Sequence, residues 1–276
     1  MTFQNGGTFV TILPGLVSVS ISDCMVNAST ILQAEEQLPL GVDVQGSGAV
    51  VTVERSTFIN CTNAINLSGG GVGKSLSVND CAFIDPINAG INIADNTTVN
   101  VINSRFNSTV PAQIYNRNIG IAIMYPQYLS SDADSASLTV AGCEFIDVIN
   151  GVGAHTGQVS IDQSRFERNS DIGVVFVMDD DRRRSSQKHS ESVSSLFCPF
   201  NCTNSLFLNN GNDHLTAMAN MIIVQNNSCE GAGAAMETEC DFVCVMKNNQ
   251  GCVVNPLKQM QEEKKGKKDK IVLVEQ

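Results

Sequence analysis

One long segment gathers the side chains best suited to bind a ligand. Residues 109–136 contain all three tyrosines of the chain, together with an arginine and two aspartates. Tyrosine rings offer apolar faces to a sugar or a peptide, and a few charged groups can fix its orientation. The alternative is that this segment packs its own tyrosines against the body of the protein. The candidate ligand-binding residues are Tyr115, Arg117, Tyr125, Tyr128, Asp132 and Asp134.

Six of the ten cysteines are concentrated near the end of the chain. An even and locally dense set predicts a cap that is stapled by disulfides. A zinc site is the alternative, because Cys198-x-x-x-Cys202 and Cys240-x-x-x-Cys244 would supply four thiolates. A third alternative is that all ten thiols are reduced, inside a cell. The disulfide candidates are Cys198, Cys202, Cys229, Cys240, Cys244 and Cys252.

Asn-x-Ser/Thr sequons are slightly more frequent than the composition alone would give. Together with the cysteines they favour an extracellular or cell-surface location. No basic and apolar leader follows Met1, so the sequence shows no signal peptide. The glycosylation candidates are Asn27, Asn60, Asn66, Asn96, Asn107, Asn201 and Asn226.

A repeated pattern positions these groups. It reads apolar, polar, polar, Cys or Ser, any residue, aromatic, any residue, acid or amide, as in Val78–Asp85. Such self-similarity is the signature of a solenoid, and the gaps indicate a unit of 21 to 25 residues with three insertions. The Cys or Ser of the pattern falls at Cys24, Ser56, Cys81, Ser104, Cys143, Ser164 and Ser205.

Each repeat begins with alternating apolar and polar residues, as in Val51-Thr52-Val53, which is typical of a half-buried strand. A second short strand, such as Asn88–Ile93, follows the aromatic residue, and no helical stripe lies between. We therefore predict an all-β, single-stranded, right-handed parallel β-helix of about eight coils. Cys24, Cys81 and Cys143 alternate with serines, so successive cysteines lie two coils apart, and all three are expected to be free, buried thiols.

The domain organisation follows from the repeats. Residues 1–210 are expected to form the coils, with insertions near 30–40, 109–136 and 178–198. Residues 196–254 are expected to form the Cys-rich terminal coil or cap. The Lys-rich residues 255–276 are expected to be disordered or a short helix. Phe3-Gln4-Asn5-Gly6-Gly7 has the form of the end of another repeat, so we expect the chain to be part of a longer one.

Over about residues 8–210 the repeats resemble those of the right-handed parallel β-helices of the pectate-lyase-like superfamily. Phe166-Glu167-Arg168-Asn169 and Phe207-Leu208-Asn209-Asn210 also resemble the Phe-x-x-Asn repeat of the chlamydial polymorphic outer membrane proteins, whose Gly-Gly-Ala-Ile element is missing here in clean form. The first resemblance implies the fold but no particular reaction, because proteins with this fold have many different functions.

The resemblance also defines what an enzyme on this fold would need. The galacturonase type has clustered aspartates with Gly-His-Gly and Arg-x-Lys motifs, and neither motif occurs in this chain. The lyase type has acidic calcium ligands and an arginine base. Asp85 and Asp147 share one repeat position and Arg105 and Arg165 another, but the two aspartates lie two coils apart. We therefore expect no catalytic residues, no metal site and no cofactor, with calcium as the one ion that the resemblance allows.

Composition narrows the function further. The formal net charge is −11, which argues against nucleic acid and anionic membranes as partners, and no apolar run is long enough to span a bilayer. The sequence predicts a non-catalytic surface or secreted module that recognises a glycan or a protein. Its role would be binding or structural, with adhesion as one form of binding. The alternatives are a polysaccharide lyase or glycoside hydrolase, and an intracellular solenoid that recognises proteins.

Overall fold

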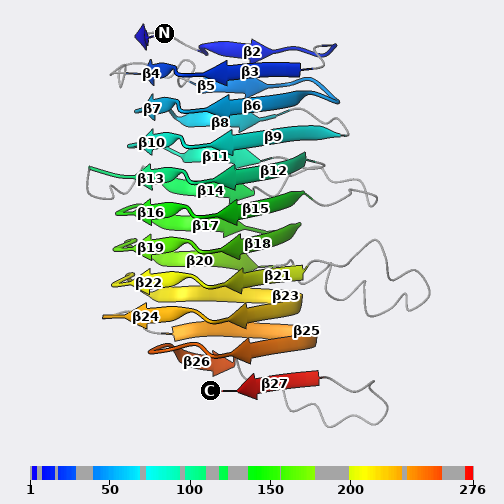
Figure 1. The fold of residues 1–276 in the computed structure, drawn as a ribbon, viewed down its shortest axis with the longest axis vertical. Coiled ribbons are helices and arrows are strands. Elements are labelled where there is room, and N and C mark those ends of the chain that lie inside the picture. Colours follow the sequence, from blue (N-terminus) through cyan, green and yellow to red (C-terminus); the bar gives the residue numbers. More distant parts are fainter. Residues whose placement is uncertain are drawn as a thin grey trace, which may run out of the picture.

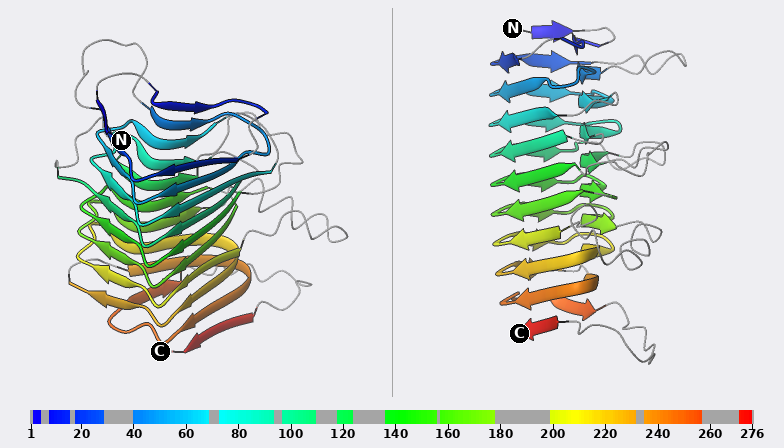
Figure 2. Two further views of the ribbon diagram at one scale, coloured as in Figure 1. Left: turned by 45° about the horizontal axis from the view of Figure 1, so that its top comes forward. Right: turned by 90° about the vertical axis from the view of Figure 1, so that its right-hand side faces the viewer.

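The computed structural model describes residues 2–4, 8–15, 18–28, 40–68, 73–93, 97–109, 118–123, 136–155, 157–177, 199–231, 235–256 and 271–275. Every regular element in these ranges is a β-strand, and neighbouring strands pair in parallel. Figures 1 and 2 show the strands stacked in coils along one axis, with the chain termini at opposite ends. The fold is a right-handed parallel β-helix, which confirms the prediction from the repeats.

Each coil passes through three columns of stacked strands in turn. Column 1 contains β3 (Ser18–Ser22), β6 (Val50–Glu54), β9 (Lys74–Asn79), β12 (Thr97–Ile102), β15 (Ser137–Ala141), β18 (Gln158–Asp162) and β21 (Pro199–Thr203). Column 2 contains β1 (Thr2–Gln4), β4 (Met25–Asn27), β7 (Thr57–Ile59), β10 (Ala82–Ile84), β13 (Arg105–Asn107), β16 (Glu144–Ile146), β19 (Arg165–Glu167), β22 (Leu206–Leu208) and β24 (Ser228–Glu230). Column 3 contains β2 (Val10–Ile12), β5 (Leu40–Val44), β8 (Asn63–Leu67), β11 (Ala89–Ile93), β14 (Ile119–Ile123), β17 (Asn150–Ala154) and β20 (Ile172–Val177).

The last coils are built differently. Two long strands, β23 (Asp213–Gln225) and β25 (Ala235–Lys247), run through column 3 and on into column 1 without a corner loop. β26 (Val253–Pro256) pairs with the first part of β25, and β27 (Ile271–Glu275) pairs with its last part. The prediction of disorder or helix for residues 255–276 is therefore wrong for β27. Its apolar run Ile271-Val272-Leu273-Val274 suits a strand, and the lysines before it obscured that pattern.

A left-handed residue turns the chain from column 1 to column 2 in every coil. The nine residues at this corner have φ between +44° and +63°. Asparagine, aspartate and glycine tolerate this conformation best, and they occupy most of the positions. The corner residues are Asp23, Arg55, Asp80, Asn103, Gly142, Gln163, Asn204, Asn226 and Asn248.

Six phenylalanines stack through the centre of the molecule. They are fully buried, and successive ring centroids lie 4.5 to 5.4 Å apart with planes nearly parallel. Glycines on column 3 make room for the rings, since a Cβ at Gly120 would lie 2.5 Å from Cδ1 of Phe145. The aromatic position of the repeat is thus the main core position. The stacked rings are Phe58, Phe83, Phe106, Phe145, Phe166 and Phe207.

The Cys or Ser of the repeat forms a second ladder, just after the left-handed corner. In most coils the backbone N–H at this position donates to the side chain in the next coil, as from Cys143 N to Ser164 Oγ at 3.2 Å. The hydrogen bonds satisfy a backbone donor that the corner would otherwise leave buried and unpaired. Asn227 and Asn249 extend the ladder beyond Ser205, where the sequence pattern did not reveal it.

Candidate functional site

The six predicted ligand-binding residues lie outside the described residues. Strand β14 divides the expected insertion at 109–136, because Ile119–Ile123 belongs to column 3 and pairs with β11 and β17. Tyr115 and Arg117 therefore belong to the connection between β13 and β14. Tyr125, Tyr128, Asp132 and Asp134 belong to the connection between β14 and β15. The six residues come from two connections rather than from one loop.

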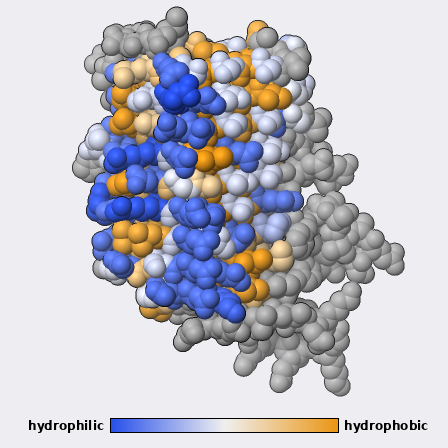
Figure 3. Space-filling model, in the orientation of Figure 1, coloured by the Kyte–Doolittle hydropathy of each residue, from blue (hydrophilic) through white to orange (hydrophobic). Residues whose placement is uncertain are grey.

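The outward face of column 1 is the most regular polar surface among the described residues. Its middle row presents a hydroxyl or an amide in seven successive coils, and the backbone register places each residue beside the next. All seven are exposed or half-buried. In Figure 3 this face is the pale surface beside a vertical strip of hydrophilic residues. We call it the hydroxyl–amide row: Ser20, Thr52, Ser77, Asn100, Thr139, Ser160 and Asn201.

The hydroxyl–amide row has the geometry of a flat, evenly spaced array. Strands in a sheet lie about 4.8 Å apart, so six steps extend over about 29 Å. Each hydroxyl and amide can both donate and accept a hydrogen bond, which suits sugar hydroxyls or an extended backbone. The row ends where Ile223 and Val245 take the same register position in β23 and β25. It offers hydrogen bonds at a fixed repeat and no ring for stacking.

Fixed ion pairs flank this face at the corner to column 2. Arg55 binds Asp23 of the preceding coil through two hydrogen bonds of 2.8 Å, and it also contacts Glu54. The pairing with Arg55 lowers the pKa of Asp23, so this carboxylate is charged under ordinary conditions. Exposed pairs of this kind contribute little to stability, but they fix the direction of each side chain.

The residues that could have served an enzyme are engaged in separate local contacts. Asp85 accepts hydrogen bonds from the backbone and hydroxyl of Thr109, the hydroxyl at 2.7 Å, and Asp147 accepts two of 2.8 Å from Arg168. Arg105 lies 3.8 Å from Glu144, and Arg165 lies 2.5 Å from Glu167. Glu144 and Arg165 are register partners in neighbouring coils, but each of them forms its ion pair with a different residue.

A buried polar cluster on column 3 was not predicted from the sequence. Asp43, only 6% exposed, accepts hydrogen bonds from Gln45, Asn66 and Ser68 at 2.6 to 2.8 Å. The Lys74 ammonium donates to the backbone carbonyls of Val44, at 3.3 Å, and Ser68, and burial lowers its pKa. The cluster ties three coils together at the corner between columns 3 and 1. No motif marks it, because its members lie in different repeats.

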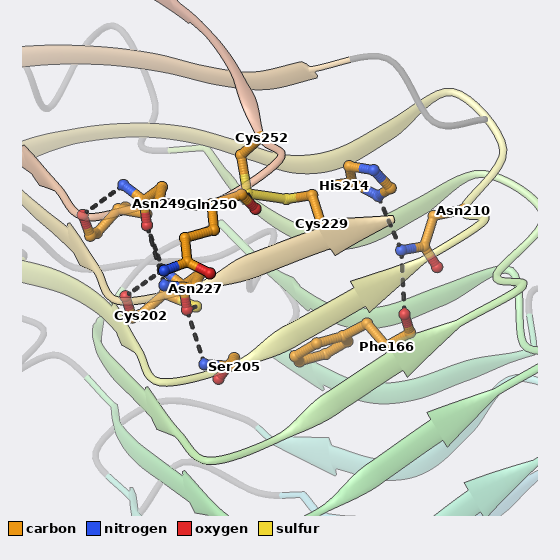
Figure 4. The surroundings of a disulfide bond; sticks show 11 residues. Phe166, Cys202, Ser205, Asn210, His214, Asn227, Cys229, Asn249, Gln250 and Cys252 are labelled. Carbon is orange, nitrogen blue, oxygen red and sulfur yellow. Dashed lines mark hydrogen bonds between the residues drawn. A yellow bond between two sulfur atoms is a disulfide. The ribbon is translucent and has the colours of Figure 1, made fainter. Parts of the chain in front are cut away.

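The cysteines of the terminal segment separate into bonded and free groups. Cys229 is bonded to Cys252, with the Cα atoms 4.9 Å apart, and Cys240 is bonded to Cys244. Figure 4 shows the first disulfide beside Asn227 and Asn249 of the ladder. Cys198 lies outside the described residues. Since Cys240 and Cys244 are bonded to each other, they are not zinc thiolates.

Cys202 was predicted to form a disulfide, and this prediction is wrong. It is a fully buried free thiol whose register partners are Ile161 and Val224, so no cysteine lies beside it in the neighbouring strands. Burial raises the pKa of Cys202 to about 12. The local density of cysteines suggested a pairing that the inward position in β21 does not permit.

The cysteines of the repeat are free, as the alternation with serine predicted. Cys81 and Cys143 are buried, and Cys24 is half-buried. Burial raises the pKa of both Cys81 and Cys143 to about 11. Buried protonated thiols are poor nucleophiles, so these side chains serve packing rather than chemistry.

The sequons differ in how accessible their asparagines are. Asn226 is exposed at the corner of its coil, whereas Asn66 is half-buried and donates from Nδ2 to Asp43 at 2.8 Å. Asn96 lies outside the described residues, and the other four candidates, Asn27, Asn60, Asn107 and Asn201, are half-buried. Asn226 is the glycosylation candidate with the most open surroundings.

Two histidines stand outside the candidate surface. His155 is exposed at a turn. His214 is buried against Phe207 and lies within hydrogen-bond distance of Asn210 Nδ2 (Figure 4), and burial lowers its pKa. Within the described ranges, no three His, Cys, Asp or Glu side chains come together as metal ligands would, and no helix could cross a bilayer.

The architecture defines a parallel β-helix, and comparison with solved structures gives similar shapes. No family model and no curated protein matches the chain. It is similar to PfbA, a surface adhesin of Streptococcus pneumoniae, at 12% identity over 90% of this chain and 82% of that one, with a TM-score of 0.48. It is also similar to the catalytic domain of a GH87 alpha-1,3-glucanase, at 11% identity over 92% of this chain and 60% of that one, with a TM-score of 0.34.

Proposed function

We propose that this protein is a non-catalytic binding module that recognises an extended glycan or protein outside a cell or on its surface. The hydroxyl–amide row carries this proposal. Seven polar side chains at a constant step of about 4.8 Å complement a ligand that itself repeats, such as a polysaccharide. The tyrosines of residues 115–128 would add apolar contacts to such a ligand.

Two further observations support the location. Disulfides persist in oxidising compartments, and two are present near the end of the chain. Asn226 offers an exposed sequon. Mass spectrometry of the protein isolated without reductant measures both features. A fully reduced chain without glycans would favour the intracellular alternative.

Binding is tested with a panel of neutral and uronate polysaccharides, with and without calcium. Size-exclusion chromatography follows the length of each polymer, and retention of the protein on immobilised polymer measures binding. We expect bound but intact polymer. Shortened polymer would establish an enzyme and would contradict the proposal.

The binding surface is located with matched variants. Thr139→Arg and Ser160→Arg together place two long cations in the middle of the hydroxyl–amide row. We expect at least about a tenfold loss of affinity, because repeated polar contacts are displaced together. Thr57→Arg on column 2 is the control and is expected to bind normally. Tyr125→Ala with Tyr128→Ala tests the tyrosines. Unchanged binding in both double variants would show that neither the hydroxyl–amide row nor the tyrosines contact the polymer.

A further inference from the structure

The polar surface of column 1 is wider than a single row. In the inner strands β9, β12, β15 and β18, the outward residue two positions before the hydroxyl–amide row is also a hydroxyl or an amide. Backbone pairing places each of these residues beside the next, and all of them are exposed or half-buried. We call this line the second polar row: Ser75, Thr98, Ser137 and Gln158.

On these strands the two rows form a grid. Neighbouring strands in a sheet lie about 4.8 Å apart, and residues two positions apart along a strand are about 6.6 Å apart. The pairing from β9 to β18 keeps one register, and Figures 1 and 2 show these strands stacked one above another. The grid therefore repeats in two directions, whereas a single row repeats in one.

The hydroxyls and amides of the grid are not used to hold the coils together. Among the described residues, no hydrogen bond within the protein engages a side chain of the grid. Column 3 differs, because there Asn92 donates to Asn66 at 2.9 Å and Asn66 donates to Asp43 at 2.8 Å. The side chains of the grid can therefore donate to, and accept from, an external ligand.

The grid contains no aromatic ring and no charged side chain. A dissolved chain that bound here would exchange hydrogen bonds with water for hydrogen bonds with the protein, which gives little net free energy for each contact. Such a chain would also lose conformational freedom on binding, with no ring on which to stack. The chains of an ordered solid have already lost that freedom, and they can contact both rows at once. The grid therefore suits a solid surface better than a single dissolved chain.

The charges around the grid favour a neutral ligand. Asp162 is the next outward residue of β18 after Ser160, and its carboxylate accepts hydrogen bonds from Thr203 and Asn204 at 2.8 and 2.7 Å. Neither row contains a lysine or an arginine, and the formal net charge of the chain is −11. A polymer that carries carboxylates or sulfates would be repelled.

From these features we infer that the grid binds the surface of an ordered, insoluble and neutral polysaccharide, in which glycan chains lie side by side. This inference rests on the proposed function and adds to it the physical state and the charge of the ligand. Hydroxyls of the solid donate to and accept from both rows together, so that many weak contacts act as one.

Co-sedimentation with solid polymers tests this inference. The unmodified chain is mixed with crystalline cellulose, chitin and mannan, with a swollen, disordered preparation of each, and with soluble oligosaccharides of the same sugars. We expect at least one crystalline solid to be bound at least about tenfold more tightly than its disordered and soluble forms, and insoluble pectate to be left unbound. Equal affinity for ordered and disordered forms, or preference for pectate, would overturn the inference and leave the proposed function standing. Absence of binding to every polymer would contradict both.

Matched variants show whether both rows take part. Thr98→Arg with Ser137→Arg changes the second polar row, and Thr139→Arg with Ser160→Arg changes the hydroxyl–amide row. Each pair is expected to weaken binding to the crystalline solid at least about tenfold. Thr57→Arg on column 2 is the control and is expected to bind normally, and far-UV circular dichroism checks that every variant is folded. Unchanged binding in the folded second-row pair would overturn the inference, because a single line of contacts would then suffice.

Discussion

At the scale of single residues, the molecule depends on a few positions that recur in every coil. The ring of the repeat fills the core, the Cys or Ser receives a backbone hydrogen bond, and the residue before it adopts a left-handed conformation. Each requirement is local, so each can be tested by a single substitution.

Phe145→Ala removes a ring from the middle of the aromatic stack. The side chain is fully buried and stacks at 4.8 Å on both Phe106 and Phe166. We expect the free energy of unfolding to fall by about 3–5 kcal/mol, because the cavity is lined by rigid neighbours. Urea denaturation measures the change, with Phe145→Leu as the milder control. A loss below about 1 kcal/mol would show that the stack does not support the core.

The buried thiols are expected to be unreactive in the native protein. Burial raises the pKa of Cys61 to about 12 and that of Cys143 to about 11, so thiolate is scarce at neutral pH. Labelling with a thiol reagent in a Cys198→Ser background should therefore be slow, except at the half-buried Cys24. The rate should rise as the pH approaches 11 or on unfolding. Rapid labelling of all five free thiols at neutral pH would contradict this assignment.

At the scale of elements, the sequence predicted the repeated strands well and the irregular ones poorly. The spacing of the Cys or Ser and the aromatic residue located the column 2 strands from β4 to β22 and the strand before each of them. Strand β14 was not predicted because no copy of the repeat pattern lies next to Ile119–Ile123. Strand β27 was not predicted because the lysines before it suggested a disordered or helical tail. The ladder members Asn227 and Asn249 were missed because Cys229 and Gly251, rather than an aromatic residue, follow them two positions later. The six candidate ligand residues stay predictions.

The two disulfides are expected to stabilise their elements unequally. Cys229–Cys252 closes a segment of 23 residues and joins β24 to the start of β26, whereas Cys240–Cys244 spans four residues within β25. Chain entropy gives about 3 kcal/mol for the longer loop and about 2 kcal/mol for the shorter. Thermal unfolding of the two paired Cys→Ser variants measures the difference. A larger loss in the Cys240/Cys244 variant would contradict it.

At the scale of the whole molecule, each coil contacts only the coils before and after it. The stability of such a stack is approximately the sum of the contributions of each coil and of its contacts with the neighbouring coils. Local stability is therefore lowest where a coil has only one neighbour. The columns continue across residues 178–198, since β20 pairs with β23 and β18 pairs with β21.

Hydrogen exchange is expected to report this gradient. Amides of the inner strands, such as β12 and β15, should be the slowest to exchange, and those of β3 and β26 among the fastest. Equal protection of the amides in all coils, measured in dilute solution, would contradict the expectation that stability is lowest in the outermost coils.

The shared register has a consequence for how such a molecule can change. Because the phenylalanine stack and the Cys/Ser ladder meet the same neighbours in every coil, gaining or losing one unit leaves the remaining contacts intact. The rod would lengthen or shorten by about 4.8 Å each time, while its side faces kept their chemistry. Duplication or deletion of a repeat can therefore change the length of the molecule along its axis without changing what the side faces recognise.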